Sequence, residues 1–185
     1  MKFVWTSAFF LLTNLFTQAQ VLTSEDVNLS FFSDAPIEDI TAESHTGVSA
    51  LNVESKSIYF KVAIRSFQFR KSLMQEHFNE NYMESHKYPH AEFKGQLTSE
   101  VDFSAAGTYP VNVEGELTIH NVTKSYRVNG ELRVTKQAIE AQATFLVKLV
   151  DHQIKIPRLL IKNIAEVVEV SVAAKYESDD LKIVK

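Results

Sequence analysis

The feature that most constrains the fold is a change of periodicity in the middle of the chain. Residues 73–83 carry apolar side chains at intervals of about four positions, which predicts an amphipathic helix. Tyr88-Pro89 ends this pattern, because proline lacks an amide hydrogen and favours an extended residue before it. A lone amphipathic helix between alternating segments must place its apolar face on a sheet. That face is formed by Met74, Phe78 and Tyr82, with Leu73 and Met83 beside them.

The segments on both sides of this helix alternate apolar and polar residues, which is typical of strands. The clearest is 57–65, where Phe60 and Val62 point the same way. Phe67 and Phe69 continue the alternation on the opposite parity, which predicts a bulge or turn near Ser66. The other predicted strands cover 27–31, 37–42, 48–53, 91–103, 109–120, 126–134, 138–150 and 167–176.

Several of these strands are about twice as long as the usual ~5–6 residues. Long, sequential, alternating strands favour an extended up-and-down antiparallel β-barrel of about eight strands, because closure removes exposed sheet edges. The amphipathic helix then lies at one rim. A two-sheet sandwich is the structural alternative. A barrel of about eight strands can enclose one small ligand.

The first nineteen residues have the features of a cleaved secretory signal peptide. Lys2 precedes a mostly apolar segment, and small residues ending at Ala19 fit a cleavage site. An uncleaved anchor or a buried first strand is the alternative. Residues 20–185 then form a single domain. The formal net charge of −4 argues against a nucleic-acid partner, and the absence of cysteine excludes disulfides, metal–thiolate sites and thiol nucleophiles.

Residues 115–124, GELTIHNVTK, resemble the GxLTxHGVTK signature of YceI-like proteins. Asn121 stands where that family has glycine, but asparagine tolerates the left-handed region, so we expect the turn to survive. The resemblance implies a lipocalin-like barrel, exported to the periplasm, that binds polyisoprenoid or other long amphiphilic lipids in its interior. Secretion beyond the periplasm is the alternative location. Further matching residues are Leu73, Met74, His77, Phe78, Tyr88, Pro89, Ala91, Phe93, Asp151, Ile154, Ile156 and Pro157.

The candidate ligand-binding residues combine the inward parity of the strands with the apolar face of the helix. Thirteen phenylalanines, with few polar residues on the same parity, favour a lipid pocket over plain core packing, which stays open as the alternative. Methionine adapts to irregular apolar shapes and suits a lid. The candidate cavity and lid residues are Phe60, Val62, Phe67, Phe69, Leu73, Met74, Phe78, Tyr82, Met83, Phe93, Leu117, Ile119, Phe145, Val147, Leu149 and Ile154. Candidates for an anionic headgroup, which also fit solvated surface charges, are Arg65, Arg70, Lys71 and Lys87.

Histidines give little support for catalysis or metal binding. His77 and Glu80 share a helical face, but Pro89 prevents the next histidines from completing a ligand set, so no metal or other cofactor is expected. No nucleophile-elbow motif occurs, and we expect a protein that is not an enzyme. The alternatives are an enzyme acting on a small hydrophobic substrate through His77 and His120, and a stress or structural barrel filled by its own side chains. The expected partners are a long-chain isoprenoid or fatty lipid and, transiently, a membrane. A homodimer is compatible with the sequence, although no residue pattern indicates one.

Overall fold

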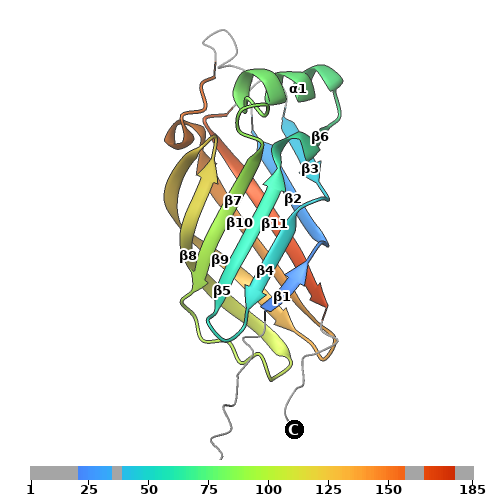
Figure 1. The fold of residues 1–185 in the computed structure, drawn as a ribbon, viewed down its shortest axis with the longest axis vertical. Helices are drawn as coiled ribbons and strands as arrows, with labels where there is room; N and C mark the ends of the chain where they lie inside the picture. The colour runs from blue at the N-terminus through green and yellow to red at the C-terminus, as the bar shows by residue number, and fades with distance from the viewer. Residues whose placement is uncertain (1–20, 35–38, 157–164, 178–185) are drawn as a thin grey trace, which may run out of the picture.

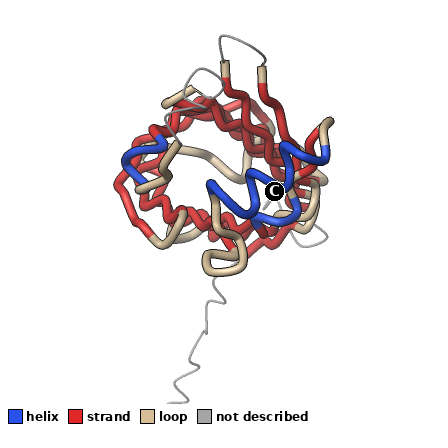
Figure 2. Tube along the Cα trace, turned by 90° about the horizontal axis from the view of Figure 1, so that it is seen from above, coloured by secondary structure: helices blue, strands red, loops and turns tan. Residues whose placement is uncertain are grey.

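The computed structural model describes residues 21–34, 39–156 and 165–177, and in these the chain is mainly β. Eleven strands form one strongly curled antiparallel sheet, accompanied by one short α-helix (Figure 1). Seen end-on, the strands follow the circumference of a ring, and helical segments lie over part of that end (Figure 2). The predicted signal peptide, residues 1–19, lies outside the described residues.

Short strands occupy the first part of the chain and longer ones the second. The first six are β1 (Val21–Ser24), β2 (Val27–Ser33), β3 (Ile40–Ser44), β4 (Val48–Asn52), β5 (Ser57–Ala63) and β6 (Gln68–Phe69). The remaining five are β7 (His90–Leu97), β8 (Gly107–Ile119), β9 (Val122–Val134), β10 (Ala138–Lys148) and β11 (Val167–Glu177). Their order in the sheet is β1-β4-β5-β7-β8-β9-β10-β11-β2-β3-β6. The helical elements are the 3₁₀ turns η1 (Ile64–Ser66) and η3 (Leu149–His152), the α-helix α1 (Ser72–His77) and the π-helix η2 (Phe78–Tyr82).

β1 and β2 are the halves of one long strand, and β3 and β4 are the halves of the strand that pairs with it. Val21 pairs with Asn52 and Leu29 pairs with Ser44, so the register is unchanged across the interruption. Because irregular residues divide long strands in this way, the described part of the chain has eleven strands where about eight were predicted. β1 was not predicted.

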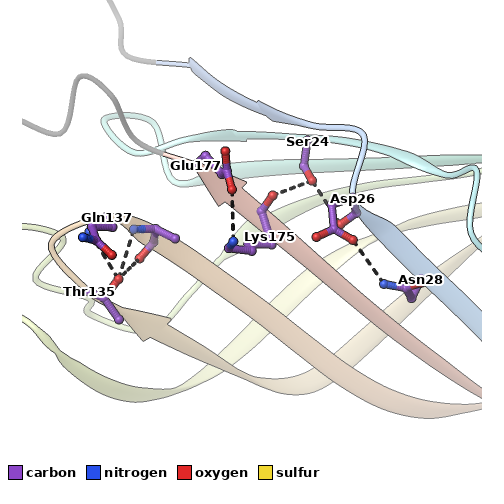
Figure 3. A network of polar contacts seen from close by, with 8 residues as sticks. Ser24, Asp26, Asn28, Thr135, Gln137, Lys175 and Glu177 are labelled. Carbon is purple, nitrogen blue, oxygen red and sulfur yellow. Dashed lines mark hydrogen bonds and ion pairs between the residues drawn. The ribbon is translucent and has the colours of Figure 1, made fainter.

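Strand β11 holds the break between β1 and β2 in place. The Lys175 amide donates to the Asp26 carbonyl at 3.1 Å. The Ser24 hydroxyl donates to the Lys175 carbonyl at 2.6 Å (Figure 3). These two hydrogen bonds satisfy backbone groups that would otherwise lose their partners at the break. The hydrogen bonding between β11 and the long strand formed by β1 and β2 therefore continues across the interruption.

The 3₁₀ turn η1 lets β5 and β6 present apolar side chains to the same interior. Val48 pairs with Lys61 and Ala42 pairs with Phe69, so the β5–β6 side carries two more residues than the β3–β4 side. The three-residue turn η1 lies in this stretch, and side chains of opposite parity on its two sides, from β5 and from β6, face inward. The predicted turn near Ser66 is confirmed.

A packed core fills the end of the sheet that lies away from α1. Leu51, Ile139 and Tyr176 are fully buried there. The Tyr176 hydroxyl forms a 2.5 Å hydrogen bond with the Ser49 hydroxyl, which also lies 2.7 Å from the Tyr59 carbonyl. Burial raises the pKa of Tyr176 to about 12, so this phenol is uncharged at neutral pH. The interior is closed by side chains at this end.

Two predicted elements end earlier than the sequence pattern indicates. The strand predicted over 91–103 ends at Leu97, and its predicted last part instead holds a turn in which the Asp102 carboxylate accepts hydrogen bonds from the amide and hydroxyl of Ser104. The strand predicted over 138–150 ends at Lys148, where η3 begins. In the described part of the chain, no helix is long and apolar enough to cross a membrane.

An apolar cavity beneath the helix

The curled sheet encloses an apolar cavity of about 210 Å³ between the packed core and the α1–η2 segment. Phe60, Phe93 and Phe145 face this interior, yet they are only partly buried. Inward aromatic rings keep accessible surface when the space beside them is not filled by other side chains. The interior is therefore not completely filled by its own side chains, which distinguishes it from a plain core.

Residues without large side chains leave room along the inner wall. Gly95 on β7 pairs with Gly115 on β8. A Cβ atom at Gly95 would lie 2.6 Å from the Phe93 ring, and one at Gly115 would lie 2.4 Å from the Lys94 carbonyl oxygen. The Phe93 ring thus lies against the glycine pair, where larger residues would push it into the cavity. Gly130 and Ala143 also line the cavity, on β9 and β10.

Four phenylalanine rings form the roof of the cavity, which we call the phenylalanine roof: Phe31, Phe67, Phe69 and Phe78. The ring centroid of Phe78 lies 5.5 Å from Phe31, 5.9 Å from Phe67 and 5.0 Å from Phe69. These separations are typical of favourable aromatic pairs. Because Phe78 belongs to η2 and the other three to the sheet and its connections, this ring attaches the helical segment to the curled sheet.

The helical segment turns more widely after α1 than the predicted helix does. The Met83 amide donates to the Phe78 carbonyl at 2.9 Å, five residues back, as in a π-helix. In an α-helix Met83 would point away from Phe78. The wider turn instead brings Phe78, Tyr82 and Met83 to the cavity together. Such single π turns occur frequently at functional sites.

A polar cluster fixes the connection between η2 and β7 to the turn between β8 and β9. His120 Nε2 lies 3.1 Å from Glu84 Oε2, and the Tyr88 ring packs edge-on against His120 at 4.3 Å. Lys87 forms an ion pair with Glu84, and the hydrogen bonds from Lys87 and then His120 lower the pKa of that carboxyl. His120 and Asn121 are the two turn residues, with φ of 52° and 59°. The predicted turn survives with asparagine, as a tight hairpin of this kind requires.

His152 in η3 is fully buried, although the sequence did not mark it as a candidate. Its Nδ1 lies 3.0 Å from the Val122 carbonyl and its Nε2 lies 3.1 Å from the Tyr126 hydroxyl. A carbonyl only accepts, so Nδ1 carries the proton and Nε2 accepts from Tyr126. Burial lowers the pKa of His152, because the charged ring would be poorly solvated.

This buried histidine predicts a loss of stability in mild acid. Unfolded histidine titrates near ~6.5, and the folded pKa of His152 lies below that value. Above about pH 6.5 the ring is neutral in both states. As the pH falls further, the unfolded chain takes up a proton that the folded chain excludes, so the free energy of unfolding decreases until the folded pKa is passed.

Thermal unfolding between pH 7.5 and 5 measures this effect. His152→Gln is expected to unfold at a lower temperature at pH 7.5, because a buried network is disturbed, but to lose less stability on acidification. A variant whose melting temperature falls with pH as steeply as that of the unsubstituted protein would show that other groups cause the acid sensitivity. His45→Gln, at an exposed histidine, is the matched control and should keep the original slope.

The structure brings nearly all predicted ligand-binding residues to the cavity. Leu73 is the exception: its side chain is 61 % exposed, because the start of α1 turns Met74 inward and leaves its neighbour outside. The alternation of β2 and β11 could have identified lining residues that were missed, namely Leu29, Phe31, Val170 and Val172. The predicted residues that line the cavity are Phe60, Val62, Phe67, Phe69, Met74, Phe78, Tyr82, Met83, Phe93, Leu117, Ile119, Phe145, Val147, Leu149 and Ile154.

The basic residues considered for a headgroup lie elsewhere. Arg65 Nε donates to the Ser85 hydroxyl at 3.2 Å, and Lys87 is paired with Glu84. None of the four candidates, Arg65, Arg70, Lys71 and Lys87, lines the cavity. In residues 21–34, 39–156 and 165–177, no group of three or more His, Cys, Asp or Glu side chains is arranged to hold a metal ion.

Comparison with known proteins gives a family and a fold. The model of the YceI-like domain family matches residues 16–176. No curated protein matches the chain by sequence. A polyisoprenoid binding domain from Saccharophagus degradans, implicated in plant cell wall breakdown, has the same fold with a TM-score of 0.72 at 15% identity, covering 86% of this chain and 99% of that chain.

Two further solved structures share the fold. BcnA from Burkholderia cenocepacia has a TM-score of 0.69 at 12% identity, covering 80% of this chain and 95% of that chain. The YceI protein of Campylobacter jejuni has a TM-score of 0.57 at 14% identity, covering 95% of this chain and 94% of that chain. At sequence identities this low, the TM-scores show that the proteins share a fold.

Proposed function

The chain belongs to the YceI-like domain family, and from this premise we propose that it binds a long-chain isoprenoid or fatty amphiphilic lipid without catalysing a reaction. The lipid is sequestered or transported inside the curled sheet. The observation that carries the proposal is the apolar cavity, into which partly buried phenylalanines project. The Saccharophagus degradans domain of the same fold is a polyisoprenoid binding domain, which supports this ligand class.

A closed barrel wall is part of the proposal, because a lipid carrier must exclude water around its ligand. β2 pairs with β11 while β4 pairs with β5, so the hairpin of β1–β2 with β3–β4 connects the two sides of the sheet. Counted with their interruptions removed, about eight long strands surround the interior, a number that can enclose one small ligand. The unchanged register of the hairpin supports closure.

The size of the cavity bears on how a long chain is accommodated. Its ~210 Å³ lies below the ~300–1,000 Å³ of typical ligand pockets. A long lipid therefore displaces side chains when it binds, and Met74 and Met83 at the helical end are adaptable enough to move. Each buried CH₂ gains ~0.8 kcal/mol relative to water, but the competing environment is a bilayer. Small polar contacts then decide which lipid is retained.

Location follows the same proposal. We place the mature protein in the periplasm after cleavage of residues 1–19, with transient membrane contact during lipid exchange. The sequence of the signal region and the family resemblance support this. Protein purified from its native compartment tests both location and function. Its intact mass should lack the first nineteen residues, and a species that retains Trp5 would contradict cleavage.

Organic extraction of the same native protein, followed by mass spectrometry, should recover a lipid with a long prenyl or acyl chain in near-stoichiometric amount. The matched control is protein refolded from denaturant in the absence of lipid, which should extract empty and then take up added lipid. Native protein that is repeatedly empty and also fails to take up lipid would overturn the proposal.

A further inference from the structure

Tyr82 is the one tyrosine among the described residues that line the apolar cavity. It is the last residue of η2, only 9 % of it is exposed, and it lines the cavity next to Met83. Other tyrosines of the described chain use their hydroxyls: Tyr176 bonds Ser49, and Tyr126 bonds His152. The Tyr82 hydroxyl has no hydrogen-bond partner among the described residues.

An unpaired hydroxyl in apolar surroundings is unfavourable, and buried polar groups in proteins are hydrogen-bonded with few exceptions. The one fully enclosed polar side-chain atom without a partner in the described residues is Asn79 Oδ1. The Tyr82 hydroxyl is not enclosed in this way, so it keeps some accessible surface. A π turn carries it, the kind of local irregularity that is frequent at functional sites. A hydroxyl so placed is suited to a partner that arrives with the ligand.

The charge of the surroundings limits what that partner is. Burial raises the pKa of Tyr82, so its hydroxyl is protonated and uncharged at neutral pH. Of the basic side chains in the described residues, Lys61 alone contributes to the lining, and its ammonium group lies 3.3 Å from the Glu92 carboxylate. A phosphate or carboxylate beside Tyr82 would lose water without gaining a counter-charge, which is costly. Moving an uncharged oxygen out of water into this cavity costs far less free energy.

We propose that the Tyr82 hydroxyl donates a hydrogen bond to an uncharged oxygen at the polar end of the bound lipid. The ligand class is thereby narrowed to lipids that end in an alcohol, ketone or ester oxygen, and phosphorylated lipids are disfavoured. This inference rests on the proposed lipid-binding function. Tyr82 acts as a residue that determines specificity, while the apolar wall supplies most of the affinity.

The experiment compares three probes that share one prenyl chain: farnesol, the hydrocarbon farnesene, and farnesyl phosphate. Their dissociation constants are measured on the whole mature protein, with and without Tyr82→Phe. A single neutral hydrogen bond is worth a factor of about three to ten in affinity. Y82F should weaken the binding of farnesol by that factor and leave the affinity for farnesene unchanged. The unsubstituted protein should bind farnesol at least about tenfold more tightly than farnesyl phosphate.

Tyr176→Phe is the matched control, since it removes a tyrosine hydroxyl from the packed core rather than from the cavity. It should lower the melting temperature and leave the ratio of farnesol to farnesene affinity unchanged. The infrared carbonyl band of bound geranylacetone gives a second readout. Its frequency should be lower in the unsubstituted protein than in Y82F, because a hydrogen bond weakens the C=O bond.

The outcomes separate this inference from the proposed function. Equal losses for farnesol and farnesene, or no loss for farnesol in Y82F, would overturn the role of the hydroxyl and leave the lipid-binding function standing. Farnesyl phosphate binding as tightly as farnesol would overturn the uncharged ligand class. Failure of the unsubstituted protein to bind any of the three probes would overturn the lipid-binding function and the inference with it.

Discussion

Ala143→Phe is expected to reduce lipid retention strongly while leaving the sheet folded. Ala143 lies on β10, lines the cavity, and pairs with Gly130 and Val172 on the neighbouring strands. A phenyl ring added here occupies space that the ligand needs. Gly130 carries no side chain, and a Cβ atom there would lie 3.1 Å from the Ala143 Cβ. We expect lipid retention to fall at least about tenfold, which corresponds to about 1.4 kcal/mol of binding free energy.

Folding should be affected much less. Filling a cavity commonly stabilises a protein by ~0.5–2 kcal/mol, and moderate overpacking costs ~1–3 kcal/mol. The melting temperature of A143F should therefore change by only a few degrees in either direction. Bound lipid per protein molecule, measured by extraction and mass spectrometry, is compared with calorimetric unfolding of the same sample.

Thr144→Phe provides the control for Ala143→Phe. Thr144 is the next residue on β10 and faces outward, where its hydroxyl bonds Ser171 at 2.9 Å. The Thr144→Phe variant carries the same added ring on the outer surface of the sheet, so it should retain lipid. If A143F is folded and still carries a full complement of lipid, the cavity beneath the helix is not the binding site.

Phe78→Ala is expected to weaken lipid retention more than it weakens folding. The Phe78 ring contacts the other three members of the phenylalanine roof and links η2 to the sheet. Elements that open for ligand exchange are drawn from the weakly packed end of the stability range. Removing the ring leaves the cavity open at this end, so bound lipid should exchange with vesicles at least about tenfold faster.

Ile139→Ala is the matched control for the packed end. Ile139 is fully buried in the core that closes the sheet away from α1. Its truncation should cost ~2–5 kcal/mol of stability and leave the rate of lipid exchange unchanged. If F78A instead lowers stability as much as a deep core substitution and retains lipid, Phe78 is ordinary core.

Hydrogen exchange tests the same motion without a substitution. The amides of residues 74–82 should exchange faster in lipid-free protein than in lipid-loaded protein, because the ligand packs against the underside of this segment. Amides of β9 at the packed end serve as the internal reference. Equal protection of residues 74–82 in both states would identify the helical segment as a fixed plug rather than a gate.

Local periodicity was sufficient to predict the antiparallel β architecture, the helix, and the inward side of β5, β7, β8 and β10. Alternation at Phe60 and Val62 defines a face whatever the neighbouring strands do. The parity change before Phe67 likewise predicts a turn near Ser66, which the structure shows as η1. The His120-Asn121 turn was predictable because its geometry depends on two adjacent residues.

The tertiary structure alone decided the features that depend on distant residues. The break between β1 and β2 is tolerated because Lys175 on β11 supplies the missing hydrogen bonds. Met83 reaches the cavity because a π turn changes the rotation of the helix after Phe78. Leu73 stays outside because the start of α1 turns its neighbour Met74 inward. The presence of a cavity depends on side-chain volumes around the whole ring, with glycine and alanine on four strands leaving space. The total side-chain volume that faces the interior cannot be read from any single segment of the sequence, because the strands contribute to it together once they are paired in register.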